Sequence, residues 1–211
     1  MATSHARKIT PPKLRRSSNG MLMTPEEFDA VTDYDDLHHY ELIHGVLVVS
    51  PFAGRAERDP NGELCFLLRK YKSEHPLGSA MDATLFEEYI HLADSRRRAD
   101  RVIWVGLGRT PDLKTDVPAI VVEFVSKSTR DRVRDYEEKR REYLDVGVVE
   151  YWVIDRFRRT LTVFRKPPAE PAEQVFGETV NYQTPLLPGF ELPLARLFGL
   201  ADLWKPRQKR R

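Results

Sequence analysis

The stretch VPAIVVEFVS, Val117–Ser126, decides the fold of this 211-residue chain. It is apolar from Val117 to Val125 apart from Glu123, and β-branched residues are frequent in it. A run of this kind is typical of a central strand that is covered on both faces, as in sheets flanked by helices. We therefore expect this stretch to form the middle strand of a sheet.

The segments on either side predict further strands and helices. β-branched and aromatic residues bounded by turn signals predict strands, and apolar residues three and four apart predict helices. The expected strands are Tyr40–Ser50 (two strands around a turn or bulge at Gly45), Asp82–His91, Arg101–Val105, Val148–Asp155, Thr160–Lys166 and an edge strand at Gln174–Tyr182. The expected helices are Thr24–Ala30 with Thr24 as its cap, Arg55–Lys72, a helix that begins at Ser128 and ends at Gly147, and Leu194–Leu203. This order predicts an α/β fold with a mixed central β-sheet flanked by helices.

The composition is that of a globular protein, with 41% hydrophobic and 31% charged residues, but the charge is distributed unevenly. Residues 1–25 hold five basic residues and no acidic one, residues 205–211 hold another five basic residues, and residues 26–204 hold 24 basic and 32 acidic residues. We expect a domain at residues 23–204 between a basic, flexible arm (1–22) and a basic tail (205–211). The basic ends either attract phosphate backbones or are simply solvated tails.

Several classes of protein are excluded by what the sequence lacks. Cys65 is the single cysteine, so an internal disulfide and a cysteine zinc site are both excluded. No apolar run approaches the roughly 20 residues of a membrane span, and the N-terminus has no apolar core of a secretion signal. We expect a cytoplasmic protein that does not enter the membrane.

Glu123 is the most informative residue because it is the only charge on the strand expected to be most buried. An unpaired carboxylate there would cost several kcal/mol. A metal, a cation or a proton would compensate the charge, so Glu123 is either a metal ligand, a partner in a buried salt bridge, or a protonated acid.

Asp100 strengthens the metal interpretation. It stands immediately before the expected strand Arg101–Val105, and the loop GLGRTPDLKTD (106–116) could join that strand to the strand of Glu123 as a hairpin. Two carboxylates on adjacent strands repel each other unless a cation lies between them, and hard oxygen ligands suit Mg²⁺ or Mn²⁺. Asp100 and Glu123 are therefore candidate metal ligands.

Two further residues and a basic stretch complete the candidates. Lys139 lies on the helix after Glu123, although Asp135 and Lys139 could also be an ordinary surface pair four residues apart. Glu41 is a charge on the first expected strand and is either a further ligand or a solvent-facing residue. The stretch Arg96–Arg98 beside Asp100 either contacts backbone phosphates or is a solvated loop.

Several motifs in order resemble one family. The segments are YELIHGVLVVSP, ADRVIWV, VPAIVVEFVSKST, DYEEKRREYLDVGVVEYWVID and LPGFELPLARLF, which span about Met23–Phe198. Together they are similar to the Uma-two family of restriction-endonuclease-like proteins, a branch of the PD-(D/E)XK nuclease superfamily. The resemblance implies a restriction-endonuclease-like core.

The resemblance also assigns roles to residues. It makes Asp100 the motif aspartate, Glu123 the motif acid, Lys139 the motif lysine and Glu41 the glutamate of the first strand. The place two residues after Glu123 holds Val125 rather than the lysine of the superfamily signature. Three other positions depart from the family pattern. His44 stands where an acid or an amide is common before Gly45. Ala99 and Lys127 both stand where proline is usual, and Lys127 joins Arg96, Arg97 and Arg98 as a candidate contact to nucleic acid.

The function implied is that of a Mg²⁺-dependent (or Mn²⁺-dependent) endonuclease that hydrolyses phosphodiester bonds in nucleic acid, with DNA as the expected partner. In this family such proteins are also expected to form homodimers. The alternative is a catalytically inactive module of the same fold that binds nucleic acid or a protein partner. The acidic composition of residues 26–204 favours the alternative slightly, because nucleases usually present a basic cleft.

Overall fold

The computed structural model describes residues 12–126 and 134–204. The chain divides into two compact units, one made of Met1–Phe52 with His91–Arg97 and the other of Ala53–Ile90 with Arg98–Arg211. No helix within the described ranges is long and apolar enough to cross a membrane.

The first unit is built around a β-hairpin. It contains η1 (Arg16–Ser18), α1 (Pro25–Asp29), β1 (His38–Ile43) and β2 (Val46–Pro51). Thr24 caps α1 in a capping box with Glu27, as predicted, because each side chain accepts the other's backbone N–H. Gly45 adopts a φ of 76° in the turn between the antiparallel strands β1 and β2, which confirms the predicted hairpin.

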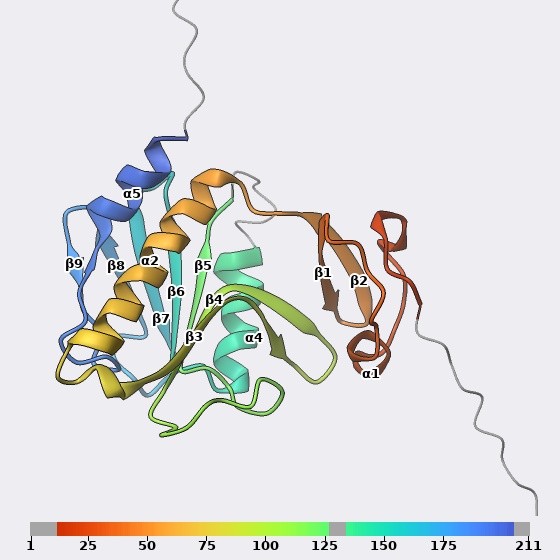
Figure 1. Ribbon diagram of the computed structural model, residues 1–211, viewed down its shortest axis with the longest axis horizontal. Coiled ribbons are helices and arrows are strands. Elements are labelled where there is room, and N and C mark those ends of the chain that lie inside the picture. The colour runs from red at the N-terminus through yellow and green to blue at the C-terminus, as the bar shows by residue number, and fades with distance from the viewer. Residues whose placement is uncertain (1–11, 127–133, 205–211) are drawn as a thin grey trace, which may run out of the picture. The chain divides into compact units, whose positions relative to one another are not determined.

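The second unit contains a mixed sheet and the larger helices (Figure 1). Its strands are β3 (Met81–His91), β4 (Arg96–Val105), β5 (Ile120–Phe124), β6 (Glu150–Asp155), β7 (Thr160–Arg165) and β8 (Glu173–Gly177), with β9 (Asn181–Tyr182) and β10 (Leu192–Pro193) in a separate pair. Its helices are α2 (Arg55–Glu74), η2 (Gly78–Ala80), the π-helical turn η3 (Arg134–Glu138), α4 (Lys139–Val146) and α5 (Leu194–Asp202). β3 and β4 each run from one unit into the other.

β5 is the central strand, as its sequence predicted, and all five of its residues are buried. It pairs with β4 in antiparallel and with β6 in parallel orientation, and β6, β7 and β8 then follow as antiparallel neighbours. The parallel pair requires a crossover, and the segment that contains η3 and α4 supplies it.

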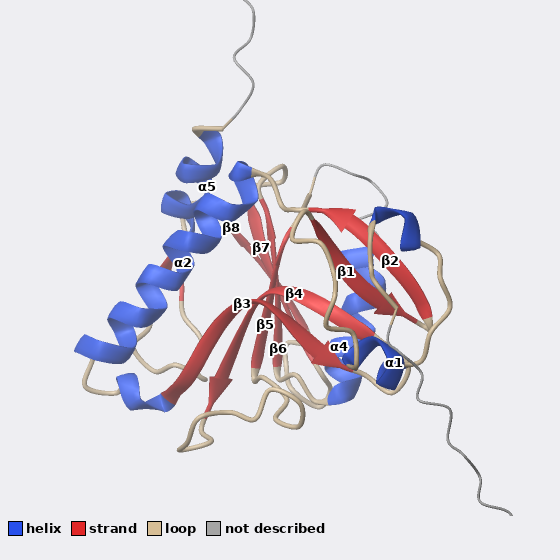
Figure 2. Ribbon diagram, turned by 45° about the vertical axis from the view of Figure 1, so that its right-hand side comes forward, coloured by secondary structure: helices blue, strands red, loops and turns tan. Residues whose placement is uncertain are grey.

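The two faces of the sheet in the second unit differ in chemistry. Figure 2 shows α2 and α5 on one side of the strands and α4 on the other. The face under α2 and α5 holds the apolar core, formed by Ile103, Ile120, Val122, Trp152, Ile154, Leu161 and Val163 from the strands and Leu64, Leu68, Leu194, Leu197 and Phe198 from the helices. Side chains of the strands alternate between faces, so Glu123 points away from this core, toward the face of α4.

Three predicted boundaries were wrong. β4 begins at Arg96, five residues before the predicted start, because the stretch interpreted as a charged loop is a strand with buried side chains. The strand predicted at Val117–Ser126 is confined to Ile120–Phe124. The edge strand predicted at Gln174–Tyr182 is divided, since β8 ends at Gly177 and a turn leads to Tyr182 in β9. The predicted helix start at Ser128 lies outside the described residues.

Candidate metal centre

Asp100 and Glu123 face each other on β4 and β5. The last aligned pair of the two strands is Arg101 opposite Val122. The same register, continued by one residue, places Asp100 opposite Glu123. Opposed side chains of an antiparallel pair project from the same face. The Asp100 Oδ2 atom also accepts the backbone N–H of Phe124 at 2.7 Å, which fastens the carboxylate to the end of β5. Asp100 therefore lies inside β4, whereas the sequence predicted that it stands immediately before the strand.

Helix α4 brings an ammonium group to Glu123. The Nζ atom of Lys139 lies 2.7 Å from Glu123 Oε1, and the Tyr143 hydroxyl donates to the same oxygen at 3.1 Å. Lys139 and Tyr143 are four residues apart, so they share one face of the helix. The pair is enclosed, because Lys139 is 2% exposed and Glu123 is 3% exposed.

Asp135 is a third acid at this place that sequence reasoning missed. It was interpreted as half of a surface pair with Lys139, but it is only 4% exposed. Its Oδ1 atom lies 3.6 Å from Lys139 Nζ, and its backbone carbonyl accepts the Tyr151 hydroxyl at 2.9 Å. The one signal in the sequence was its spacing of four residues from Lys139. A surface pair and a buried pair share that spacing, so the pattern alone could not separate them.

Carboxylates lie close together in this cluster. Burial and the charge of Glu123 raise the pKa of Asp100 well above its usual value, although Lys139 acts in the opposite direction. Burial and the charge of Glu123 likewise raise the pKa of Tyr151. Among the residues that the structure describes, Lys139 contacts both Glu123 and Asp135, and Arg134 adds a more distant contact of 3.8 Å with Asp135.

The donor set suits a cation that keeps water and substrate among its ligands. No group of three or more His, Cys, Asp or Glu side chains that could hold a metal lies within residues 12–126 and 134–204. Mg²⁺ does not require such a cage, since one or two carboxylates with waters and phosphate oxygens commonly hold it. The two opposed carboxylates of Asp100 and Glu123 meet that requirement.

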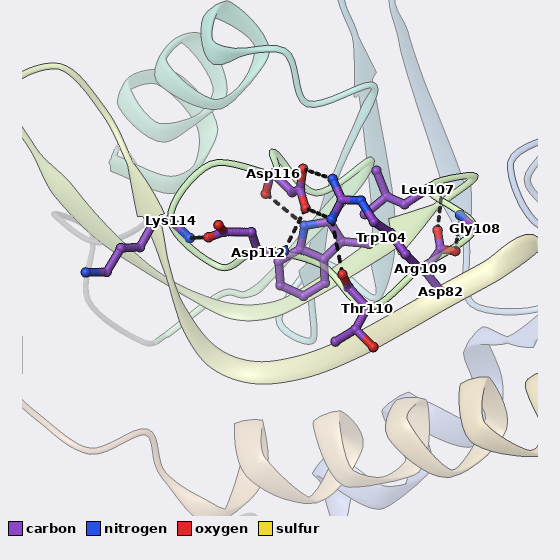
Figure 3. Close-up of polar contacts among 9 residues, drawn as sticks. All are labelled: Asp82, Trp104, Leu107, Gly108, Arg109, Thr110, Asp112, Lys114 and Asp116. Atoms are coloured by element: carbon purple, nitrogen blue, oxygen red, sulfur yellow. Dashed lines mark hydrogen bonds and ion pairs between the residues drawn. The ribbon is translucent and has the colours of Figure 1, made fainter.

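The loop that joins β4 to β5 is fixed by polar contacts with Asp82 of β3 and by contacts within the loop (Figure 3). Asp82 accepts the backbone N–H groups of Leu107 at 2.7 Å and Gly108 at 2.8 Å. Arg109 forms a two-pronged ion pair with Asp116, with N–O distances of 2.5 and 2.8 Å. These contacts hold the ends of the two strands that lie farthest from Asp100 and Glu123, and so help to set the register that opposes the two acids.

The basic residues predicted to contact nucleic acid are largely engaged within the protein. Arg96 binds Asp29 through Nε and Nη2 at 2.9 and 2.8 Å, and Arg97 is 0% exposed. Arg98 is half-buried and forms an ion pair with Glu87 at 3.0 Å. A contact of Arg96, Arg97 or Arg98 with nucleic acid stays a prediction. Lys127 lies outside the described residues.

Glu41 belongs to the first unit, where it is a buried residue of β1 opposite Val48 of β2. The interpretation of Glu41 as a solvent-facing residue is wrong, because its side chain is covered. Its role as a further ligand stays a prediction.

Comparison with known proteins identifies the family. The model of the Uma2 (Uma-two) family, described as "Putative restriction endonuclease", matches residues 25–195. The chain belongs to the Uma2 family. The solved structure of a "putative nuclease belonging to DUF820 from Anabaena variabilis ATCC 29413" is similar to this Uma2 chain, with a TM-score of 0.67 and 16% identity over 85% of this chain and 99% of that one. The likeness confirms the predicted nuclease-like α/β fold. A search of curated proteins gives no match.

Proposed function

We propose that this Uma2 protein is a divalent-metal-dependent endonuclease that hydrolyses phosphodiester bonds in DNA. The observation that carries the proposal is the opposition of Asp100 and Glu123 across β4 and β5, with Lys139 in contact with Glu123. Membership in a family described as "Putative restriction endonuclease", and similarity to a solved protein described as a "putative nuclease", support a nuclease.

Each residue of the cluster has a role in this proposal. Asp100 and Glu123 would hold Mg²⁺ or Mn²⁺, and a bound ion of this kind polarises a phosphate and lowers the pKa of a coordinated water. Lys139 would neutralise negative charge on the phosphate or orient the water, as a fixed cation in a water-poor site does. Tyr143 would hold the Glu123 carboxylate in place through its hydroxyl.

The placement of the acids argues against the inactive module as the first choice. Asp100 and Glu123 lie at opposed positions of β4 and β5, and two carboxylates held side by side favour a cation between them. The like-charged Asp100 makes the arrangement still less favourable in the absence of a cation. The acidic composition of residues 26–204 keeps the module as the second candidate.

A cleavage assay with the purified full chain tests the proposal. Supercoiled DNA, single-stranded DNA and RNA are incubated with Mg²⁺, Mn²⁺ or a chelator, and Asp100→Ala and Lys139→Ala are assayed beside the wild type. We expect the wild type to nick DNA only with a metal, and each variant to lose at least about 100-fold in rate, as in other preorganised electrostatic sites.

Two results would count against an endonuclease. Cleavage that persists in both variants would indicate another site or a contaminating enzyme. Binding of DNA without cleavage under any metal condition would favour the inactive module.

A further inference from the structure

The backbone of Asp100 is held from the side of the sheet opposite to its carboxylate. The Nδ2 group of Asn61, on α2, donates to the Asp100 backbone carbonyl at 2.9 Å. On the other side, the Asp100 carboxylate accepts the Phe124 N–H. Asp100 is thus fixed by a helix behind the sheet and by the end of β5, just beyond the last aligned pair of β4 and β5.

Arg101 determines how the Asn61 amide is oriented. Its Nε donates to Asn61 Oδ1 at 2.6 Å and its Nη2 to the Asn61 backbone carbonyl at 3.1 Å. Arginine has no acceptor, so the oxygen of the amide must face Arg101 and the NH₂ group is left to face Asp100. Thr84 accepts the third donor, Nη1, at 3.1 Å and itself donates to the carbonyl of Val102 at 3.0 Å.

Burial of the Arg101 guanidinium costs free energy, which is unfavourable for a side chain whose only role is packing. Arg101 is 2% exposed. Its partners named above are neutral amide, carbonyl and hydroxyl groups, and burial of a charge without an acid among these partners is unfavourable. What the network does provide is a defined position for one carbonyl, that of Asp100.

We propose that Asn61, oriented by Arg101, is a positioning residue that keeps β4 in the register that places Asp100 opposite Glu123. Asn61 acts through the Asp100 backbone and touches neither metal nor substrate. The inference rests on the proposed metal-dependent function, because its consequence is an effect on the affinity for the cation. Residues that orient metal ligands typically contribute 10- to 100-fold to metal affinity or activity.

Asn61→Asp separates this role from a contribution to stability. The aspartate still accepts from Arg101, and the bond gains charge assistance, but it can no longer donate to the Asp100 carbonyl. The new carboxylate oxygen repels the Asp100 carbonyl, and the charge-assisted bond to Arg101 offsets part of this cost. We therefore expect the melting temperature to fall less than in Asn61→Ala, while the Mg²⁺ concentration for half-maximal cleavage rises about tenfold. The rate at saturating Mg²⁺ should change much less.

Asn61→Ala and Thr184→Val provide the second variant and the matched control. Asn61→Ala removes both bonds, so it should lower the melting temperature and raise the Mg²⁺ requirement by a similar factor. Thr184 is buried, whereas Asn61 is half-buried, and it donates one hydrogen bond to Glu150, in a separate cluster. Thr184→Val should lower the melting temperature and leave the Mg²⁺ requirement of the folded protein unchanged.

The outcomes distinguish this inference from the function on which it rests. Wild-type cleavage with an unchanged Mg²⁺ requirement in both Asn61 variants refutes the positioning role alone. A Mg²⁺ requirement that rises in Thr184→Val as much as in Asn61→Ala also refutes it, since any loss of stability would then suffice. Absence of cleavage by the wild type with every metal refutes the proposed function, and this inference with it.

Discussion

Two buried glutamates on neighbouring strands of the second unit have opposite environments. Glu123 lies near the end of β5 and Glu150 at the start of β6, where it is aligned with Ile120. Glu150 is 1% exposed, and Glu123 is nearly as well covered. Burial of an acid is therefore not what distinguishes a candidate metal ligand from a structural residue in this protein.

The hydrogen-bond and ion-pair partners distinguish the two glutamates. Glu150 accepts hydrogen bonds from Trp152, Tyr182 and Thr184 at 2.9 to 3.1 Å, and Arg165 pairs with it at 2.7 Å. All four are donors, so the charge of Glu150 is compensated by its own surroundings.

Glu123 shares its cation with other acids. Lys139 and Tyr143 donate to it, but Asp135 lies against the same ammonium group, and the charge of Glu123 raises the pKa of Asp100. The difference teaches that neighbouring carboxylates, rather than burial, indicate where a further cation is favourable.

The largest difference between the Glu123 and Glu150 sites should come from removing the ammonium group of Lys139. Lys139→Met is expected to lower the single-turnover cleavage rate at least about 100-fold, because a preorganised positive charge is lost from the site. Circular dichroism must show that the variant is folded, since it leaves Glu123 without its ammonium partner. Cleavage within a few fold of the wild-type rate would show that Lys139 is structural, like Arg165.

Glu150→Gln tests the other half of the contrast. The amide cannot satisfy Arg165 as the carboxylate does, so we expect a loss of about 2 to 3 kcal/mol in the free energy of unfolding, measured with urea. The cleavage rate per folded molecule should equal that of the wild type. A specific loss of activity at full folding would place Glu150 among the functional residues and end the contrast.

Asp100→Asn should reveal the surplus charge in the metal-free protein. A folded-state pKa above the unfolded value near 3.9 means that the folded state holds the proton more tightly. The contribution of Asp100 to stability is thus present below the unfolded pKa and is lost as pH rises through the folded pKa. At neutral pH we expect the melting temperature of Asp100→Asn, measured with a chelator present, to exceed that of the wild type by a few degrees.

The pH dependence provides the control for this variant. The advantage of Asp100→Asn should shrink toward pH 4, where the wild-type carboxyl is protonated. A variant that is less stable than the wild type at neutral pH would show that the Asp100 charge is already compensated.

Tyr143→Phe is expected to give the smallest effect. The hydroxyl donates a single hydrogen bond to Glu123, so its removal should cost about 1 kcal/mol of stability and a few fold in rate. Thermal unfolding and the same cleavage assay measure both. A loss as large as that of Lys139→Met would assign the hydroxyl a direct part in the reaction.

Features with local causes were predictable from the sequence. The cap at Thr24, the turn at Gly45, the helix end at Gly147 with its φ of 114°, and the hairpin of β6 and β7 all depend on residues close together in the chain. The strand of Glu123 was predictable as well, because a nearly continuous apolar run has few alternatives to a central strand.

Features that depend on distant partners were not predictable. Arg96 and Arg101 resemble loop and strand-edge charges in the sequence, because their partners Asp29 and Asn61 are far away along the chain. Asp135 was missed because an acid and a lysine four residues apart have the same spacing in a buried pair as in a surface pair. Residue type and spacing could identify Asp100, Glu123 and Lys139 as candidates, but the groups that orient them required the structure.

The most direct test of the claim that Asp100 and Glu123 bind a cation is a calorimetric titration of Mn²⁺ into the wild type, Asp100→Asn and Glu150→Gln. We predict binding to the wild type and to Glu150→Gln with equal affinity, and a loss of at least about tenfold in Asp100→Asn. Equal binding in all three proteins, or none in the wild type, would contradict the claim.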